Sequence, residues 1–199
     1  DTQLDSQSGA NSDSRIINPL ALNMYLLGFD ANKKLVTVNQ AVKENIQTYL
    51  TQFRMVTDAI NIKNAFVINI GVKFNVLTKV GYNKEEVVLK SIQRVKDFFN
   101  IDKWQIGQPI VLADLAYQIS LVDGVSAVVP PEEDNPNGHP VLITNKFKVG
   151  SGYSGNAYDI VGATRGGVVY PSLDPSCFEL KYPNIDIEGR AVGNSTGGN

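Results

Sequence analysis

The sequence has very little of the residues that most often carry covalent or acid–base chemistry. Among its 199 residues, His139 is the only histidine and Cys177 the only cysteine. A cysteine–histidine nucleophile needs both side chains within hydrogen-bond reach and a third group to orient the base. No recognisable motif surrounds either residue, and a loop histidine beside Pro140 and a buried thiol are simpler interpretations. The sequence therefore predicts a protein that is not an enzyme.

A single cysteine also excludes an intrachain disulfide framework, which suits synthesis in a reducing cytoplasm. No apolar run approaches the roughly 18 residues that a membrane-spanning helix needs, so we predict no membrane span. The chain begins at Asp1, without an initiator methionine or the plan of a signal peptide. We therefore expect a fragment of a longer protein.

The sequence also lacks a large net charge of either sign. The 18 basic and 20 acidic residues leave a formal net charge of −2. No cluster of lysine or arginine is dense enough to neutralise a phosphate backbone. Nucleic acid is therefore not an expected partner.

The sequence contains only imperfect versions of metal and phosphate motifs. Glu133, Asn135 and Asn137 imitate the first half of a calcium loop, but Thr144 occupies the position where a bidentate glutamate is needed. An exposed turn at Asn137-Gly138 explains these residues better. The glycine-rich run 150–155 lacks the lysine of a phosphate loop, which favours a flexible link. We predict no metal, no cofactor and no small-molecule substrate.

What the sequence does contain is clear hydrophobic periodicity. Residues 38–53 carry apolar side chains at helical spacing, which predicts an amphipathic helix with one buried stripe of Val38, Val42, Ile46, Tyr49, Leu50 and Phe53. Residues 65–76 alternate with a period of two, which predicts a long half-buried strand. On that strand, the side chains expected to face solvent or another subunit are Asn69, Lys73 and Asn75.

Two further helices follow the predicted strand. Asn83 and Glu86 resemble a capping box that opens a helix over residues 83–99. We expect that helix to bury Val88, Ile92, Val95 and Phe99. A third helix with Val111, Leu115 and Ile119 on one face is predicted to end at Gly124, where glycine supplies a left-handed backbone.

These elements predict an α+β fold, with amphipathic helices packed on a small mixed sheet and a β-rich carboxy-terminal extension. Residues 1–15 are polar and predict a flexible leader. Residues 16–130 form the expected core. Residues 131–199 are expected to form a β-rich arm laid on the core or on a neighbour, with short strands at 141–149, 158–161, 168–170 and 178–182.

The order of these elements resembles a known family. Helix, long strand, helix, the run DKWQIG at 102–107, helix and Gly124-Val125 follow one another as in the carboxy-terminal part of baseplate J-like proteins. The flanking runs are similar to baseplate wedge proteins of T-even-type contractile-tailed phages, namely INPLALNMY at 17–25, VYPSLDP at 169–175 and FELKYP at 178–183. The resemblance covers roughly residues 16 to 192.

The resemblance implies a structural component of a contractile-tail baseplate wedge. Such a protein would form homodimeric contacts and contacts with other wedge proteins, building a ring around the central hub that rearranges when the tail contracts. It would reside in the virion and be assembled in the host cytoplasm. The family has no catalytic signature. The alternative is a tail-associated receptor- or glycan-binding module with Trp104 as a stacking platform, although a core anchor is a simpler role for Trp104.

Aromatic residues in the carboxy-terminal extension are the candidate contact residues, because aromatic side chains are favoured anchors of protein interfaces. Packing of these residues on the chain's own core is the alternative. The candidates are Tyr153, Tyr158, Tyr170, Phe178 and Tyr182.

Overall fold

The computed structural model describes residues 21–53, 59–132, 135 and 137–192. The predicted α+β class is confirmed by five α-helices and mixed sheets. The proposed leader at residues 1–15 lies outside the described residues. In the part of the chain that is described, no helix is both long and apolar enough to cross a membrane.

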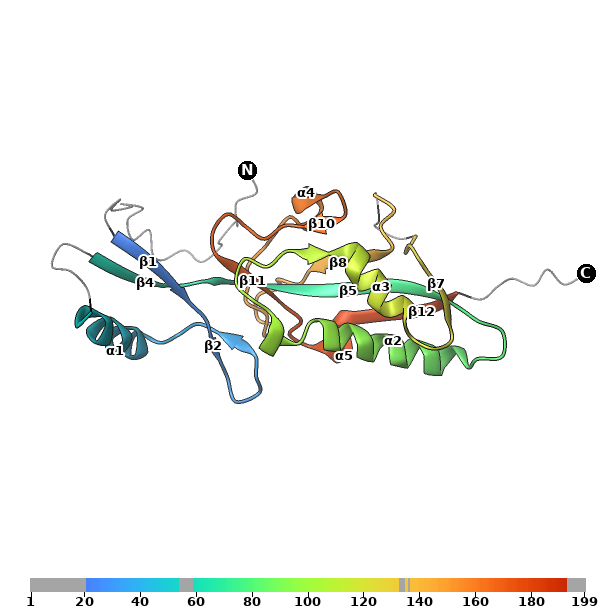
Figure 1. Cartoon of the computed structure of the whole chain (residues 1–199), viewed down its shortest axis with the longest axis horizontal. Coiled ribbons are helices and arrows are strands. Elements are labelled where there is room, and N and C mark those ends of the chain that lie inside the picture. Colours follow the sequence, from blue (N-terminus) through green and yellow to red (C-terminus); the bar gives the residue numbers. More distant parts are fainter. Residues whose placement is uncertain (1–20, 54–58, 133–134, 136, 193–199) are drawn as a thin grey trace, which may run out of the picture.

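The strand β5 (Phe66–Thr78) forms the centre of the main sheet, as Figure 1 shows. Two strands pair with it in parallel, β11 (Ser176–Glu179) and β12 (Ile187–Val192). Two others pair with it antiparallel, β7 (Val125–Val129) and β8 (Val141–Asn145). All four partners are short, and each of them is held in the sheet by its hydrogen bonds to β5.

One face of β5 forms the core. Its even-numbered residues from Ile68 to Val76 are buried together with side chains from α2 (Lys84–Phe98) and α3 (Leu112–Ser120). Asn83 caps α2 by accepting hydrogen bonds from the N–H groups of Glu85 and Glu86, as predicted from the sequence. Val95 and Phe99 are buried as predicted, whereas Val88 and Ile92 are only partly buried. Val87 and Ser91 are buried in their place.

The opposite face of β5 corrects the prediction of a half-buried strand. Asn69 is fully buried instead of facing solvent, and Lys73 and Asn75 are half-buried. The cause is the loop around Ser154, which lies over this face and donates hydrogen bonds from Ser154 to Asn69 Oδ1 and to the Val67 carbonyl. A polar side chain on an alternating strand can therefore be covered by a distant loop.

The segment after residue 130 enters the main sheet, whereas the sequence suggested an arm laid on the core. It supplies β8, β11 and β12, each of which pairs with β5. The strand expected at 158–161 is instead largely the short helix α4 (Ile160–Ala163), capped by Asp159. The remaining elements of this region and its neighbours are η1 (Ile101–Lys103), β6 (Ile110–Val111), β9 (Thr164–Arg165), β10 (Val168–Val169) and α5 (Pro183–Asp186).

The elements that precede β5 in the chain form a small unit at one end of the molecule (Figure 1). The strands β1 (Ala21–Leu26) and β4 (Ala59–Asn64) pair in parallel, connected through α1 (Gln40–Thr51). A small hairpin of β2 (Gly28–Phe29) and β3 (Leu35–Val36) precedes α1. The strand β4 leads through the buried Ala65 directly into β5. This β1–α1–β4 unit is therefore an extension of the central strand.

Candidate functional site

The helix α1 differs from the other long helices because none of its residues is buried. Val42, Tyr49 and Phe53 are 43%, 61% and 71% exposed. The sequence predicted this amphipathic helix correctly, but the prediction that its apolar stripe would be buried is wrong. Residues close in the sequence fix the start of the helix, because Asn39 Oδ1 accepts a hydrogen bond from the Val42 N–H at 2.9 Å and caps the first turn.

Four apolar residues in and just after α1 follow a particular spacing; Ile46 among them is half-buried, and Phe53 lies two residues beyond the last residue of the helix. Val42, Ile46, Tyr49 and Phe53 are separated by four, three and four positions. That alternation keeps one apolar seam along a helix and is the pattern by which helices pack on other helices. The rings of Tyr49 and Phe53 lie 5.1 Å apart, so they form one aromatic surface at the end of the seam. We call these four residues the α1 seam.

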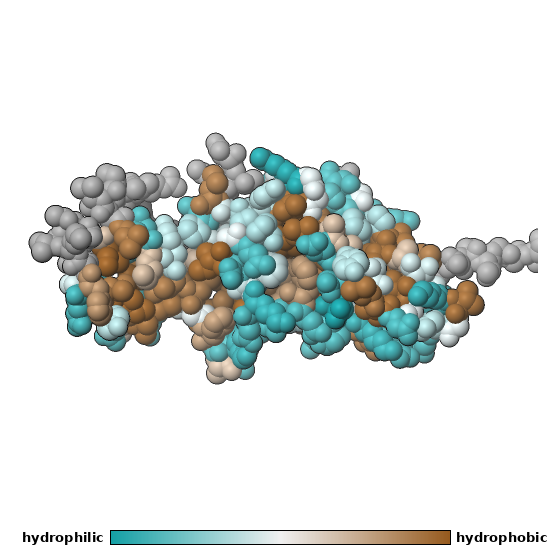
Figure 2. Space-filling view, viewed as in Figure 1, coloured by the Kyte–Doolittle hydropathy of each residue, from teal (hydrophilic) through white to brown (hydrophobic). Residues whose placement is uncertain are grey.

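Hydrogen bonds connect α1 and the segment before it to β4. Gln47 donates a side-chain hydrogen bond to the Ile60 carbonyl, and the Val38 N–H just before the helix donates to Asn64 Oδ1. The two-stranded sheet beside it is small, and an isolated pair of strands is marginally stable in water. Figure 2 shows hydrophobic side chains gathered at this end of the molecule. Val42, Tyr49 and Phe53 of the α1 seam are therefore exposed, whereas Ile46 and the neighbouring Leu50 are half-buried by the rest of the chain.

The predicted contact residues fall into different environments. Phe178 is buried in the core, with its ring 6.2 Å from that of the buried Tyr158. Tyr158 also donates a hydrogen bond to the Tyr170 carbonyl. These two side chains pack on their own core, which was the alternative interpretation, and cannot serve as exposed anchors.

Tyr153 and Tyr182 are half-buried and contact each other edge to face, with ring centroids 5.3 Å apart. The Tyr153 hydroxyl donates to Asp186 Oδ1 at 2.6 Å. Burial, followed by this hydrogen bond, raises the pKa of Tyr153 to about 12. The pair fastens the segment before α5 and has only part of its surface free.

Tyr170 alone of the five is largely exposed, at 49%. It lines a shallow groove of about 830 Å³ with the exposed apolar side chains of Ile106 and Leu173, and Arg165 supplies a charge. Tyr170 therefore lies on a second apolar surface, and the residues of that surface are distant in the sequence from the α1 seam.

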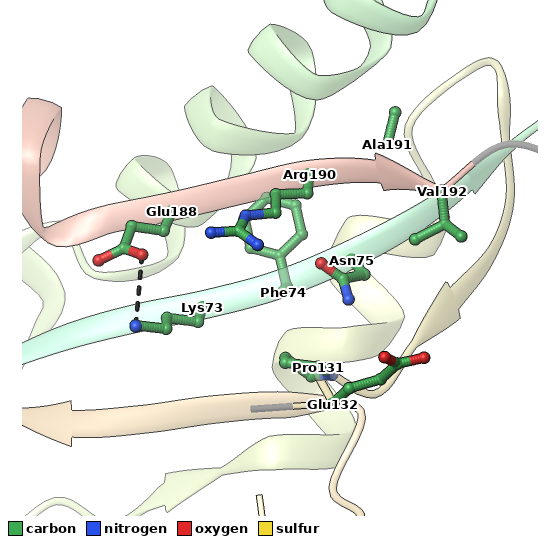
Figure 3. Close-up of a pocket in the computed structure, with 9 residues that line it drawn as sticks. All are labelled: Lys73, Phe74, Asn75, Pro131, Glu132, Glu188, Arg190, Ala191 and Val192. Carbon is green, nitrogen blue, oxygen red and sulfur yellow. Dashed lines mark ion pairs between the residues drawn. The ribbon is translucent and has the colours of Figure 1, made fainter. Parts of the chain in front are cut away.

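A charged hollow lies on the face of β5 opposite the core, where Lys73 and Asn75 are not covered by the Ser154 loop (Figure 3). Its volume is about 430 Å³. Lys73 Nζ lies 3.4 Å from Glu188 Oε2, and Lys146 Nζ lies 4.0 Å from the other oxygen. Arg190 points into the same hollow from β12. The charges of this hollow are largely matched across the strands, as expected of a solvated sheet face.

A polar cluster in the interior joins four distant parts of the chain. Glu179 accepts hydrogen bonds from the Leu35 N–H at 2.6 Å and from Asn69 Nδ2 at 2.7 Å. Ser154 closes the cluster through its bond to Asn69. Sequence reasoning missed this cluster because its four residues lie far apart in the chain and match no motif. It fixes the run 150–155 against β5, where the sequence suggested a flexible link.

Cys177 is buried, and burial followed by the nearby Glu179 raises its pKa to about 12, which disfavours the reactive thiolate. Across the described ranges, no group of three or more histidine, cysteine, aspartate or glutamate residues could hold a metal ion. Asn135 binds the carbonyls of Pro131 and His139 with its amide, so it organises its own loop.

Trp104 is half-buried and packs against Phe98 and Phe99, with ring centroids 5.9 and 5.2 Å away. Its indole nitrogen is buried, and no hydrogen-bond partner for it lies among the described residues. This position matches a core-edge anchor, and it gives the glycan-stacking alternative no exposed platform at Trp104.

Comparison with known protein families and with curated proteins finds no match to this chain.

Proposed function

We propose that this chain is a structural component of a phage contractile-tail baseplate, part of a wedge protein like the one specified by gene six of T-even-type phages. It would form homodimeric contacts and contacts with other wedge proteins that build the ring around the hub. The observation that carries the proposal is the α1 seam, because an exposed apolar stripe on a fully formed helix indicates a protein interface.

The order of elements supports the same proposal. The helix α1, the long strand β5, the helix α2, the Trp104 turn, the helix α3 and the Gly124 turn follow one another in the order that carried the family resemblance. Gly124 has a φ of +92°, a backbone conformation that favours glycine. The family resemblance and the exposed α1 seam support the proposal independently. The resemblance rests on the order of the elements, and the seam rests on the exposure of its side chains.

The mechanical role follows from how the β1–α1–β4 unit is attached. The strand β4 continues into β5, the central strand of the sheet, so force on α1 would be transmitted to the most buried part of the molecule. A contact built on α1 could then bear load while the core stays folded. The Tyr170 groove offers a second surface for a different neighbour, as a ring requires at least two contacts per subunit.

Light scattering over a range of concentrations tests the proposal. We expect the parent chain to self-associate, and Tyr49→Ser to weaken the association by about tenfold, as removal of an interface anchor does. Tyr117→Ser is the matched control, because Tyr117 on α3 is 60% exposed, as Tyr49 is at 61%. A strictly monomeric parent, or equal effects of the two substitutions, would contradict a role for the α1 seam in self-association.

A further inference from the structure

We infer that the α1 seam binds the α1 seam of a second copy of this chain, with the two helices antiparallel about a two-fold axis. The inference rests on the proposed function and specifies its partner and geometry. It follows from the distribution of side-chain size, helix-end charge and exposure along α1.

Side-chain size changes along the seam. Val42 near the start of α1 and Ile46 near its middle are aliphatic, and Tyr49 in its last turn and Phe53 just beyond its last residue are aromatic. An antiparallel pair centred between Gln47 and Thr48 places Val42 against Phe53 of the second copy and Ile46 against Tyr49 of the second copy. Every layer then combines one large and one smaller side chain, which fills space evenly.

A parallel pair does not pack in this way. It would place Phe53 against Phe53 and Tyr49 against Tyr49 at one end, and Val42 against Val42 at the other. The aromatic end would be overfilled and the valine end would leave a gap, and both defects reduce stability. The sequence of the seam is therefore complementary to itself only in the antiparallel direction.

Helix-end charges favour the same direction. The helix α1 has no acidic residue in its first turn and no basic residue in its last turn, whereas α2 has Glu85 and Glu86 at its start and Lys96 at its end. The ends of α1 therefore lack the usual compensation of the helix dipole. An antiparallel neighbour supplies it, because the positive end of each helix lies beside the negative end of the other.

Repulsion does not oppose the pairing. The only charged residues of α1 are Lys43 and Glu44, which have opposite signs. Glu44 already accepts a hydrogen bond from Gln40 at 3.0 Å. A helix of 12 residues is about 18 Å long, so the contact is short and the association is expected to depend on concentration.

Disulfide trapping tests the direction of the pair. Ile46→Cys and Tyr49→Cys, each made in a Cys177→Ser background, are mixed in equal amounts, oxidised and separated by intact mass. The antiparallel pair brings residue 46 of one copy beside residue 49 of the other, within the reach of a disulfide. We expect the mixed product to exceed each like-with-like product by about tenfold. Thr48→Cys, which lies off the seam, is the control and should give little cross-linked product.

The outcomes separate the inference from the proposed function. Predominance of like-with-like disulfides would overturn the antiparallel arrangement and leave self-association standing. A stable dimer that forms no cross-link through α1 would also overturn the inference, because the second copy would then bind elsewhere. A parent chain that is monomeric by light scattering and gives no cross-link would overturn both the inference and the homodimeric part of the proposed function.

Discussion

Asn69 on β5 and Glu179 on β11 lie side by side in the interior, joined by a hydrogen bond of 2.7 Å from Asn69 Nδ2 to Glu179 Oε2. Both side chains are buried. Because the two strands pair in parallel with these residues in register, the bond crosses from one strand directly to the next. The arrangement ties the carboxy-terminal region to the central strand through a buried carboxyl group.

Removing Asn69 should therefore destabilise the whole fold. Asn69→Ala leaves one oxygen of Glu179 and the Ser154 N–H without their partner, and an unsatisfied buried group of this kind costs about 2 to 3 kcal/mol. Urea unfolding measures the change in the free energy of unfolding. Asn137→Ala, at an exposed loop position, is the control and should change it by less than about 0.5 kcal/mol. Similar values for both variants would show that the cluster contributes little.

Truncation of Phe178 should cost much more stability than truncation of Tyr170. Phe178→Ala empties part of the core and should lower the free energy of unfolding by about 3 to 5 kcal/mol. Tyr170→Ala removes an exposed ring and should cost less than about 1 kcal/mol. Thermal or urea unfolding measures both. A small effect of Phe178→Ala would contradict its placement in the core and restore it as a candidate contact residue.

The hydroxyl of Tyr153 should lose its proton at a higher pH than the hydroxyl of an ordinary tyrosine. Its pKa is raised from the ordinary 10.0 to about 12, first by burial and then by the hydrogen bond to Asp186. A raised pKa means that folding favours the neutral phenol, so this stabilisation is complete below pH 10 and is lost as the pH rises toward about 12. Ultraviolet absorbance of tyrosinate measures the titration.

Asp186→Asn should lower the pKa of Tyr153 only in part, because burial remains and is the larger cause. Tyr153→Phe is the control that removes this titration and identifies it among the eight tyrosines. A Tyr153 titration near pH 10 in the parent would contradict the burial of the hydroxyl.

Local signals in the sequence were sufficient for some elements. The helix α2 was predicted from Asn83 and from apolar residues at helical spacing, because capping and periodicity depend only on neighbours in the chain. The strand β5 was likewise predicted from its alternation. What the alternation could not show is that Asn69 would be buried, because its cover comes from Ser154, which is 85 positions away.

Two other differences have the same origin in tertiary contacts. The strand β12 was not predicted, because Gly189 interrupts its pattern; a side chain there would lie 2.7 Å from the Phe74 ring, so the sheet requires glycine. The helix α1 was predicted, but its environment was not. Periodicity shows that Tyr49 and Phe53 share one face, and it does not show whether that face meets the same chain or another.

Gly124 and Gly81 allow the cost of a backbone conformation to be separated from the cost of a close contact. Their φ values are +92° and +90°, so alanine is strained at both positions by about 1 kcal/mol or more. A Cβ at Gly124 would lie 2.6 Å from both the Tyr82 ring and Val87, whereas nothing lies within 4 Å at Gly81.

We therefore expect Gly124→Ala to lower the free energy of unfolding by about 2 to 4 kcal/mol and Gly81→Ala by about 1 kcal/mol, since overpacking adds to the backbone strain only at Gly124. Urea unfolding of the two variants measures the difference. If the values were equal, the close packing of the α3–β7 turn against α2 would have no energetic weight, and Gly124 would be required for its backbone conformation alone. A larger value at Gly124 would show that the turn holds α2 in place as well as ending α3.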